Sequence, residues 1–269
     1  MSTLMVNATD PRAVPAAVRA LARSGELDHH TAGMAAGYAQ ANLAILPRAL
    51  AYEFLLFCQR NPKPCPLLDV TDAGSPEPRL VAPGADLRTD LPRYRVYRHG
   101  VLVDEPTDIV RLWRDDLVAF LLGCSYTFEA PMVEAGIAVR HLDCGRNVPM
   151  YRTNRACVPA GRIAGPLVVS FRAIPATQVA RAVQVTSRFP AVHGAPVHIG
   201  DPESLGIRDL ASPDWGDPPV IEPGDVPVFW ACGVTPQAVA MTIKPELMIT
   251  HSPGYMFVTD VPIASLAVG

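Results

Sequence analysis

The chain has 269 residues, of which 49% are hydrophobic and 18% are charged, and its formal net charge is −3. This composition is typical of a globular protein with a large core and excludes a disordered chain. The near-neutral charge without a basic run argues against a nucleic-acid partner, and no apolar stretch approaches the roughly 20 residues that a membrane span requires.

The N-terminal third is predicted to be helical, and a strand and a hairpin are predicted to follow it. Asp10-Pro11 resembles an N-cap followed by proline at the first helical position, and Gly25 ends the helix that it opens. His99-Gly100 is typical of a hairpin turn between two short strands. In chain order, we expect helices over 13–24, 30–41 and 47–59, strands over 66–70, 94–98 and 101–103, and helices over 111–122 and 128–135.

The C-terminal half alternates strands and helices without strict βαβ spacing, which predicts an α/β fold with an α+β subdomain. The chain is expected to form one unit over 1–269, with a smaller subdomain at roughly 145–215 inserted into a larger one made of 1–144 and 216–269. The expected elements are a strand over 165–174, a helix over 177–187, a strand over 226–231, a helix over 235–243, and strands over 247–250 and 255–259.

Two cysteines lie in turns that are suited to chemistry. Cys232 follows a predicted buried strand and precedes Gly233 and Thr235, which open a predicted helix. Free amides and the helix dipole would favour a thiolate or a substrate carboxylate there. Cys124 lies in a similar turn before the helix that carries Glu129, so these residues are also catalytic candidates.

The two thiols have two interpretations. They can act as a paired acid and base across a carbon that bears an acidic proton, as in cofactor-free amino-acid racemases. They can also be two unrelated, inert core thiols. The chain has six cysteines, no Cys-x-x-Cys pair and no secretory signal, which predicts reduced thiols in a cytoplasmic protein.

Histidines supply the remaining candidate acids and bases. His193, His198 and Asp201 share a loop that is stiffened by glycine and proline. Their spacing matches no zinc signature, so metal binding by these three is the weaker interpretation and acid–base work by either histidine is the stronger one. His251, at the end of a predicted strand, is a further candidate, although each histidine can instead be structural. We expect no cofactor and leave a divalent metal open.

Arginine guanidinium groups and asparagine side-chain amides near these loops are suited to bind a substrate carboxylate. For any single arginine, a surface or interdomain salt bridge is the alternative. The candidate substrate-binding residues are Arg146, Asn147, Tyr151, Arg152, Asn154, Arg188, Gly233 and Thr235.

Five motifs together resemble one bacterial family, which carries the name "Putative hydro-lyase" and is grouped with D-glutamate cyclase. The resemblance extends from roughly Arg19 to Asp260, and the sequence departs from the family pattern mainly beside Glu129 and His251. The motifs are Gly-Cys-Ser-x-x-Phe-Glu (123–129), Arg-Asn-Val-Pro-Met-Tyr-x-Thr-Asn (146–154), Ser-Arg-Phe-Pro-x-Val-His-Gly-Ala-Pro-Val-His-x-Gly-Asp-Pro (187–202), Val-Phe-Trp-Ala-Cys-Gly-Val-Thr-Pro-Gln (228–237) and Thr-His-x-Pro-Gly (250–254).

The resemblance implies a two-part fold and a water-removing lyase reaction. We expect one layered α/β/α subdomain and a smaller two-layer α/β sandwich. The substrate would be a small amino or hydroxy carboxylic acid, and D-glutamate would close to the lactam 5-oxo-D-proline. The alternatives are a two-cysteine isomerase or racemase and a non-catalytic protein that binds a small acid. The sequence is compatible with a homo-oligomer.

Overall fold

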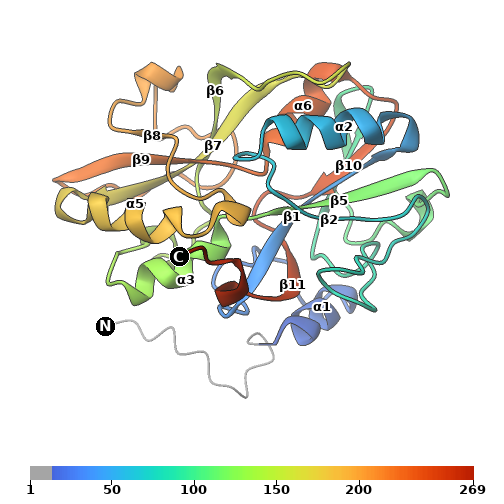
Figure 1. Ribbon diagram of the computed structural model, residues 1–269, viewed down its shortest axis with the longest axis horizontal. Helices are drawn as coiled ribbons and strands as arrows, with labels where there is room; N and C mark the ends of the chain where they lie inside the picture. Colours follow the sequence, from blue (N-terminus) through green and yellow to red (C-terminus); the bar gives the residue numbers. More distant parts are fainter. Residues whose placement is uncertain (1–13) are drawn as a thin grey trace.

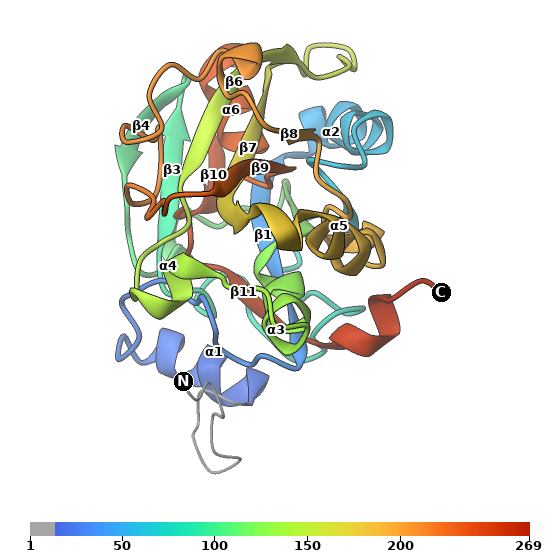
Figure 2. The ribbon, with the colours of Figure 1, turned by 90° about the vertical axis from the view of Figure 1, so that its left-hand side faces the viewer.

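A computed structural model describes residues 14–269 and shows two antiparallel sheets with α-helices over their faces (Figures 1 and 2). The seven-stranded sheet contains β1 (Tyr38–Pro47), β2 (Leu67–Val70), β3 (Tyr94–Arg98), β4 (Val101–Asp104), β5 (Leu117–Gly123), β10 (Met248–His251) and β11 (Phe257–Pro262). The four-stranded sheet contains β6 (Met150–Ala156), β7 (Pro166–Pro175), β8 (His198–Ile199) and β9 (Asp225–Ala231). The α-helices are α1 (Pro15–Arg23), α2 (Arg48–Arg60), α3 (Tyr126–Glu134), α4 (Arg140–Asp143), α5 (Val179–Ser187) and α6 (Thr235–Ile243).

Strand β1 is the centre of the larger sheet, and nearly all of it is buried. Its side chains alternate between two cores: Leu43 and Ile45 face one cluster, whereas Ala44 and Leu46 face the cluster under α2. On one side β1 pairs with β5. On the other side two strands share it, because β10 pairs at residues 44–45 and β11 at 38–41.

Helices α3 and α6 join the two sheets. Helix α3 follows β5 of the larger sheet but packs against α5, which covers the smaller sheet. Helix α6 follows β9 of the smaller sheet and contacts both β7 and β10, and Figure 1 shows it between these strands. Gln237 of α6 accepts a hydrogen bond from the Tyr97 hydroxyl at 3.1 Å and donates one to the His251 carbonyl at 2.9 Å. The turns that precede both helices therefore lie where the sheets meet.

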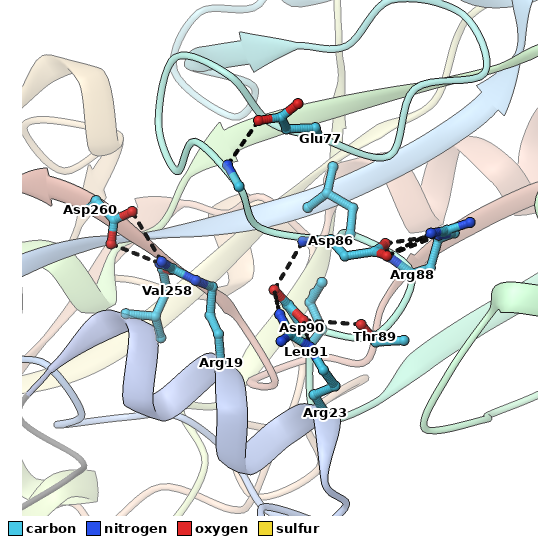
Figure 3. A network of polar contacts seen from close by, with 12 residues as sticks. Arg19, Arg23, Glu77, Asp86, Arg88, Thr89, Asp90, Leu91, Val258 and Asp260 are labelled. Carbon is cyan, nitrogen blue, oxygen red and sulfur yellow. Dashed lines mark hydrogen bonds and ion pairs between the residues drawn. The ribbon is translucent and has the colours of Figure 1, made fainter.

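Helix α1 is fastened to the larger sheet by two arginines (Figure 3). Arg19 donates to both carboxylate oxygens of Asp260, at 2.9 and 3.0 Å, and Arg23 does the same to Asp90 at 2.8 and 2.7 Å. The Asp90 side chain is fully buried, and it also accepts from the Asp86 amide and the Thr89 hydroxyl. Bidentate arginine–carboxylate pairs of this kind fix the helix in one position.

The predicted fold class is confirmed, since the structure mixes helices with two antiparallel sheets. Most predicted elements also occur within a few residues of their expected bounds, including the hairpin at His99-Gly100 and the helix over 235–243. The Asp10-Pro11 cap lies outside the described residues. The strands of the smaller sheet come from Met150–Ala231, and the subdomain division at 145–215 stays a prediction.

Two predicted helices are wrong. Residues 30–41 form turns and the start of β1, because Ala39 and Ala41 are completely buried in the sheet and tertiary packing outweighs the helix propensity of alanine. Residues 111–122 contain a short 3-10 turn and β5. The apolar run at 117–122 is buried on both faces, and periodicity cannot distinguish such a strand from a buried helix. In residues 14–269, no helix is both long enough and apolar enough to cross a membrane.

Candidate functional site

The two candidate cysteines occupy equivalent positions. Cys124 directly follows β5 and precedes α3, while Cys232 directly follows β9 and precedes α6. Both side chains are 6% exposed, and both belong to one hydrophobic cluster with Tyr126, Met150 and other residues. The structure therefore brings the two thiols to one place, where the sheets meet.

A shared hydrogen-bond pattern holds the two cysteine turns. The Cys124 amide donates to the Gln40 carbonyl at 3.0 Å, and the Gln40 amide donates to the Thr127 hydroxyl at 3.0 Å. The same pattern recurs at the second turn, on Val168 of β7. The Cys232 amide donates to the Val168 carbonyl at 3.0 Å, and the Val168 amide donates to the Thr235 hydroxyl at 3.1 Å. Each Cys-x-x-Thr turn is thus clamped on one residue of the neighbouring strand.

Each turn also requires a glycine, because another part of the chain approaches it closely. A Cβ on Gly123 would lie 2.0 Å from the Ala191 carbonyl oxygen, and a Cβ on Gly233 would lie 2.0 Å from Nδ2 of Asn42. Real Cβ contacts are never this short, so only glycine fits. Asn42 connects the two turns, since the same Nδ2 donates to the Gly123 carbonyl at 2.8 Å.

A buried charge cluster lies beside the thiols. The Arg172 guanidinium donates to Glu129 Oε1, and to the hydroxyls of Ser125 and Ser170 at 3.1 Å each. Its Cζ lies over the rings of Phe128 and Trp230, at 5.2 and 5.4 Å from their centroids. The geometry makes the Arg172 charge a fixed part of the site.

His141 and Glu129 complete this cluster. His141 Nε2 lies 3.0 Å from Glu129 Oε1, and Glu129 is only 2% exposed. Burial by itself would raise the pKa of Glu129, but His141 and Arg172 outweigh it, and the pKa lies below its usual value. Glu129 is therefore a carboxylate at neutral pH.

The cluster acts unequally on the two thiols. Burial raises the pKa of both, that of Cys232 to about 11 and that of Cys124 further. The Arg172 charge opposes this rise at Cys232. At Cys124 the Glu129 carboxylate adds to the rise by more than Arg172 subtracts. Both groups are neutral thiols at neutral pH, and Cys232 is the easier one to ionise.

Two buried histidines flank the cysteine turns. His193 Nδ1 lies 2.6 Å from the Lys63 carbonyl, and the preceding residues pack on Gly123. His251 Nδ1 lies 3.1 Å from the Leu43 amide nitrogen, where the partner of β1 changes from β10 to β11. Burial lowers the pKa of each to about 4, so both rings are neutral at neutral pH. Nε2 of each ring is buried and has no partner within residues 14–269.

The His193–Asp201 loop divides into two environments. His193 points to Lys63, whereas His198 lies on β8 with its Nε2 2.7 Å from the Asp201 carbonyl. In the part of the chain that the structure describes, no three His, Cys, Asp or Glu side chains are grouped to hold a metal ion. His198 and Asp201 thus lie apart from the cysteine turns.

The predicted substrate-binding residues also separate into two groups. Gly233 and Thr235 belong to the Cys232 turn. Asn147 accepts from the Tyr126 hydroxyl at 2.7 Å and donates to the Pro253 carbonyl at 2.8 Å, which ties the Cys124 helix to the loop after His251. The others contact different groups: Arg146 the Pro218 carbonyl, Tyr151 the Leu210 carbonyl, Arg152 the Trp215 ring and Asn154 Gly206, while Arg188 lines a groove beside α5.

Sequence reasoning missed Arg172, His141 and Asn42. Arg172 carried a usable signal, because a charged residue inside a strand that is otherwise apolar is rarely buried without a partner. Asn42 carried a weaker one, as one of two polar residues, with Gln40, in the alanine-rich run of β1. Neither signal identifies the partner, which for Arg172 lies 43 residues away in the sequence.

Comparison with known proteins defines the class to which this fold and site belong. The sequence profile of the D-glutamate cyclase family matches residues 118–260. A "Putative hydro-lyase" of Stutzerimonas stutzeri is 66% identical over 94% of this chain and 96% of its own length. The "Putative hydro-lyase YcsI" of Bacillus subtilis is 62% identical over 94% of this chain and 99% of its own length. The chain belongs to the D-glutamate cyclase family.

Among solved structures, a nitrogen repressor-like protein of Methanococcus jannaschii is similar at a TM-score of 0.37 and 9% identity, over 81% of this chain and 86% of that one. That likeness is too distant to support an argument about function.

Proposed function

We propose that this protein is a hydro-lyase that removes water from a small amino or hydroxy carboxylic acid. For D-glutamate, the reaction closes the lactam 5-oxo-D-proline. Membership of the D-glutamate cyclase family and the names of the relatives support a lyase. The observation that carries the proposal is the meeting of two strand-end turns, each with a thiol just before a helix, beside a fixed arginine.

The chemistry of lactam closure needs a neutral amine, a polarised carboxyl carbon and an acid that protonates the leaving oxygen. The ammonium group gives up two protons in all, nitrogen bonds to the side-chain carboxyl carbon, and one carboxylate oxygen takes up both protons and leaves as water. His193 and His251 are neutral, and the Nε2 of each is buried without a partner within residues 14–269, so this atom is suited to accept a proton. Backbone amides of the two turns are suited to stabilise the tetrahedral oxyanion.

The test is incubation of the purified protein with D-glutamate and L-glutamate in D2O, followed by mass spectrometry and proton NMR. Lactam closure gives a product that has lost one water and keeps its α-proton. Cys144→Ser changes an exposed thiol outside the site and should leave the rate unchanged, whereas Arg172→Gln should lower it at least about tenfold. Failure to remove water from glutamate, aspartate, malate and their close analogues would overturn the proposal.

A second candidate function is a cofactor-independent two-cysteine isomerase or racemase. The repeated Cys-x-x-Thr clamp favours it, because two equivalent turns hold two thiols in one cluster. Cys232, beside Arg172, is the better candidate base and Cys124 the better acid. This enzyme would exchange the substrate α-proton for deuterium without loss of water. Cys124→Ser and Cys232→Ser should each abolish the exchange, and full activity in both variants would remove this candidate.

A further inference from the structure

Two adjoining hollows lie along α3, and Glu129 lines the inner one. The inner one, of about 120 Å³, lies between α3 and the segment that leads into β1. The outer one, of about 670 Å³, lies between α3, α5 and the C-terminal segment. Ala36, Ala130 and Glu134 line both hollows, so the two meet there. Neither hollow is lined by Cys124 or Cys232.

The inner hollow offers a buried hydrogen-bond acceptor that no protein group uses. Glu129 lines this hollow, and its Oε2 is buried without a partner among the described residues. Two other polar side chains of the wall already have partners: the Gln40 side-chain amide bonds to Thr31 and Met34, and the Tyr126 hydroxyl donates to Asn147. An unsatisfied buried carboxylate oxygen is unfavourable, and a donor from a ligand removes that penalty.

The charge on this side of the cluster is negative. After burial, the Glu129 carboxylate is the largest cause that raises the pKa of Tyr126, and it acts more strongly than Arg172 acts in the opposite direction. The tyrosine rings of Tyr38 and Tyr126 and the apolar side chain of Val133 complete the wall. A carboxylate with aromatic and apolar neighbours is suited to an ammonium group on a short hydrocarbon chain.

The outer hollow has the opposite charge. Arg181 and Arg188 line it, both are exposed, and within residues 14–269 neither forms an ion pair. A simple cation would gain nothing from these two arginines, which repel it. A ligand with a carboxylate at its other end would instead gain from them.

We propose that the two hollows together bind a small ω-amino acid, with its ammonium group at Glu129 and its carboxylate facing Arg181 and Arg188. This binding site is distinct from the cysteine turns, because the thiols line neither hollow, but it shares Glu129 with the charge cluster beside them. The hydrocarbon chain between the two charged groups would lie against Val133 and Ala130. The separation of the two hollows sets the length of the ligand's hydrocarbon chain.

The experiment measures binding by titration calorimetry with ω-amino acids of three to six carbons, and with n-butylamine, butyrate and 1-butanol as partial ligands. At least one ω-amino acid should bind tenfold or more tightly than each partial ligand. Arg188→Gln should remove the preference for the ω-amino acid over the amine, whereas Arg98→Gln, an exposed arginine on the other sheet, should leave it unchanged.

Two variants test the inner hollow separately. Glu129→Gln removes the charge but also leaves Arg172 without its carboxylate, so it can disturb folding. Val133→Phe fills the hollow from a side chain that is 38% exposed, keeps the charge cluster, and should abolish binding. Equal affinity for the zwitterion and the partial ligands, or unchanged binding by Val133→Phe, would overturn the inference. Binding without loss of water would support this site and contradict only the lyase.

Discussion

His193 and His251 are held neutral inside the protein, which makes its stability depend on pH. Their pKa values of about 4 in the folded protein lie below the value of 6.5 expected after unfolding. The unfolded chain therefore binds more protons between these values, and stability that is present above pH 6.5 is lost as the pH falls toward 4. We expect the free energy of unfolding to fall by about 2 kcal/mol per histidine between pH 7 and pH 5.

Urea unfolding at both pH values checks this expectation. His193→Asn suits the left-handed backbone at this position, where φ is +84°, and His251→Gln keeps a polar side chain. The double variant should lose most of the pH dependence, whereas His29→Gln, at an exposed position, should keep it. If the unfolding free energy of the double variant changed with pH as much as that of the wild type, other groups would be the cause of the pH dependence.

At the scale of single residues, sequence reasoning identified which chemical groups are present but not how they are paired. Cys124, Cys232 and Glu129 stand out in the sequence by residue type and by their turns, and the structure places them close to one another. The arginines were selected because they adjoin the motifs in the sequence. The arginine that contacts Glu129 is Arg172, and only the packing of α3 on β7 brings the two together.

At the scale of elements, the two cysteine turns depend on the contact between Gly233 and Asn42. Gly233→Ala would place a Cβ 2.0 Å from Asn42 Nδ2 and force that side chain away from the Gly123 carbonyl. We expect a loss of about 1–3 kcal/mol in the free energy of unfolding, because the displaced Asn42 side chain loses its hydrogen bond and must be repacked in the core. Denaturant unfolding of the variant measures the loss.

Asn42→Ala provides a double-mutant test of the same contact. It removes the side chain that a new Cβ would meet, so the double variant should lose less stability than the sum of the single changes. Gly37→Ala is the matched control, since a Cβ there meets nothing within 4 Å. Strictly additive losses would show that Asn42 is not what excludes a side chain at Gly233.

The position of α1 rests on one buried carboxylate. Asp90→Ala leaves Arg23, the Asp86 amide and the Thr89 hydroxyl without their shared acceptor (Figure 3). We expect a loss of about 2–3 kcal/mol in thermal or urea unfolding, because the carboxylate is buried although Arg23 is half exposed. Asp72→Ala breaks an exposed pair with Arg79 and should cost under about 0.5 kcal/mol. Equal losses would contradict the special role of Asp90.

The elements themselves were largely predictable where caps and turns mark their ends. Helix α6 was predictable because Thr235-Pro236 marks its start and a buried strand precedes it. Strand β5 was not, because its apolar run carries no period, and β1 was not, because its alanines favour a helix in isolation. Both errors fall on strands that pair with each other in the centre of the larger sheet.

At the scale of the whole molecule, α3 and α6 should make the two sheets unfold together. Trp113 packs on the core of the larger sheet, and Trp230 lies in the core under α5. Two variants report on the sheets separately. One keeps only Trp113 and the other keeps only Trp230, and each carries phenylalanine at the two remaining tryptophan positions. Their fluorescence transitions in urea should coincide with each other and with circular dichroism. Separate midpoints would show that the two subdomains unfold independently.

The sharing of β1 by β5, β10 and β11 limits how the chain can be divided. The region that matches the family profile, 118–260, contains most of these three partner strands but not β1 itself. Expressed alone, that fragment would lack β1, so the backbone edges of β5, β10 and β11 that pair with it would be unpaired. Such exposed edges favour pairing with other copies and aggregation. The region defined by the family profile is therefore not an autonomous folding unit, and the first 117 residues supply the strand around which it assembles.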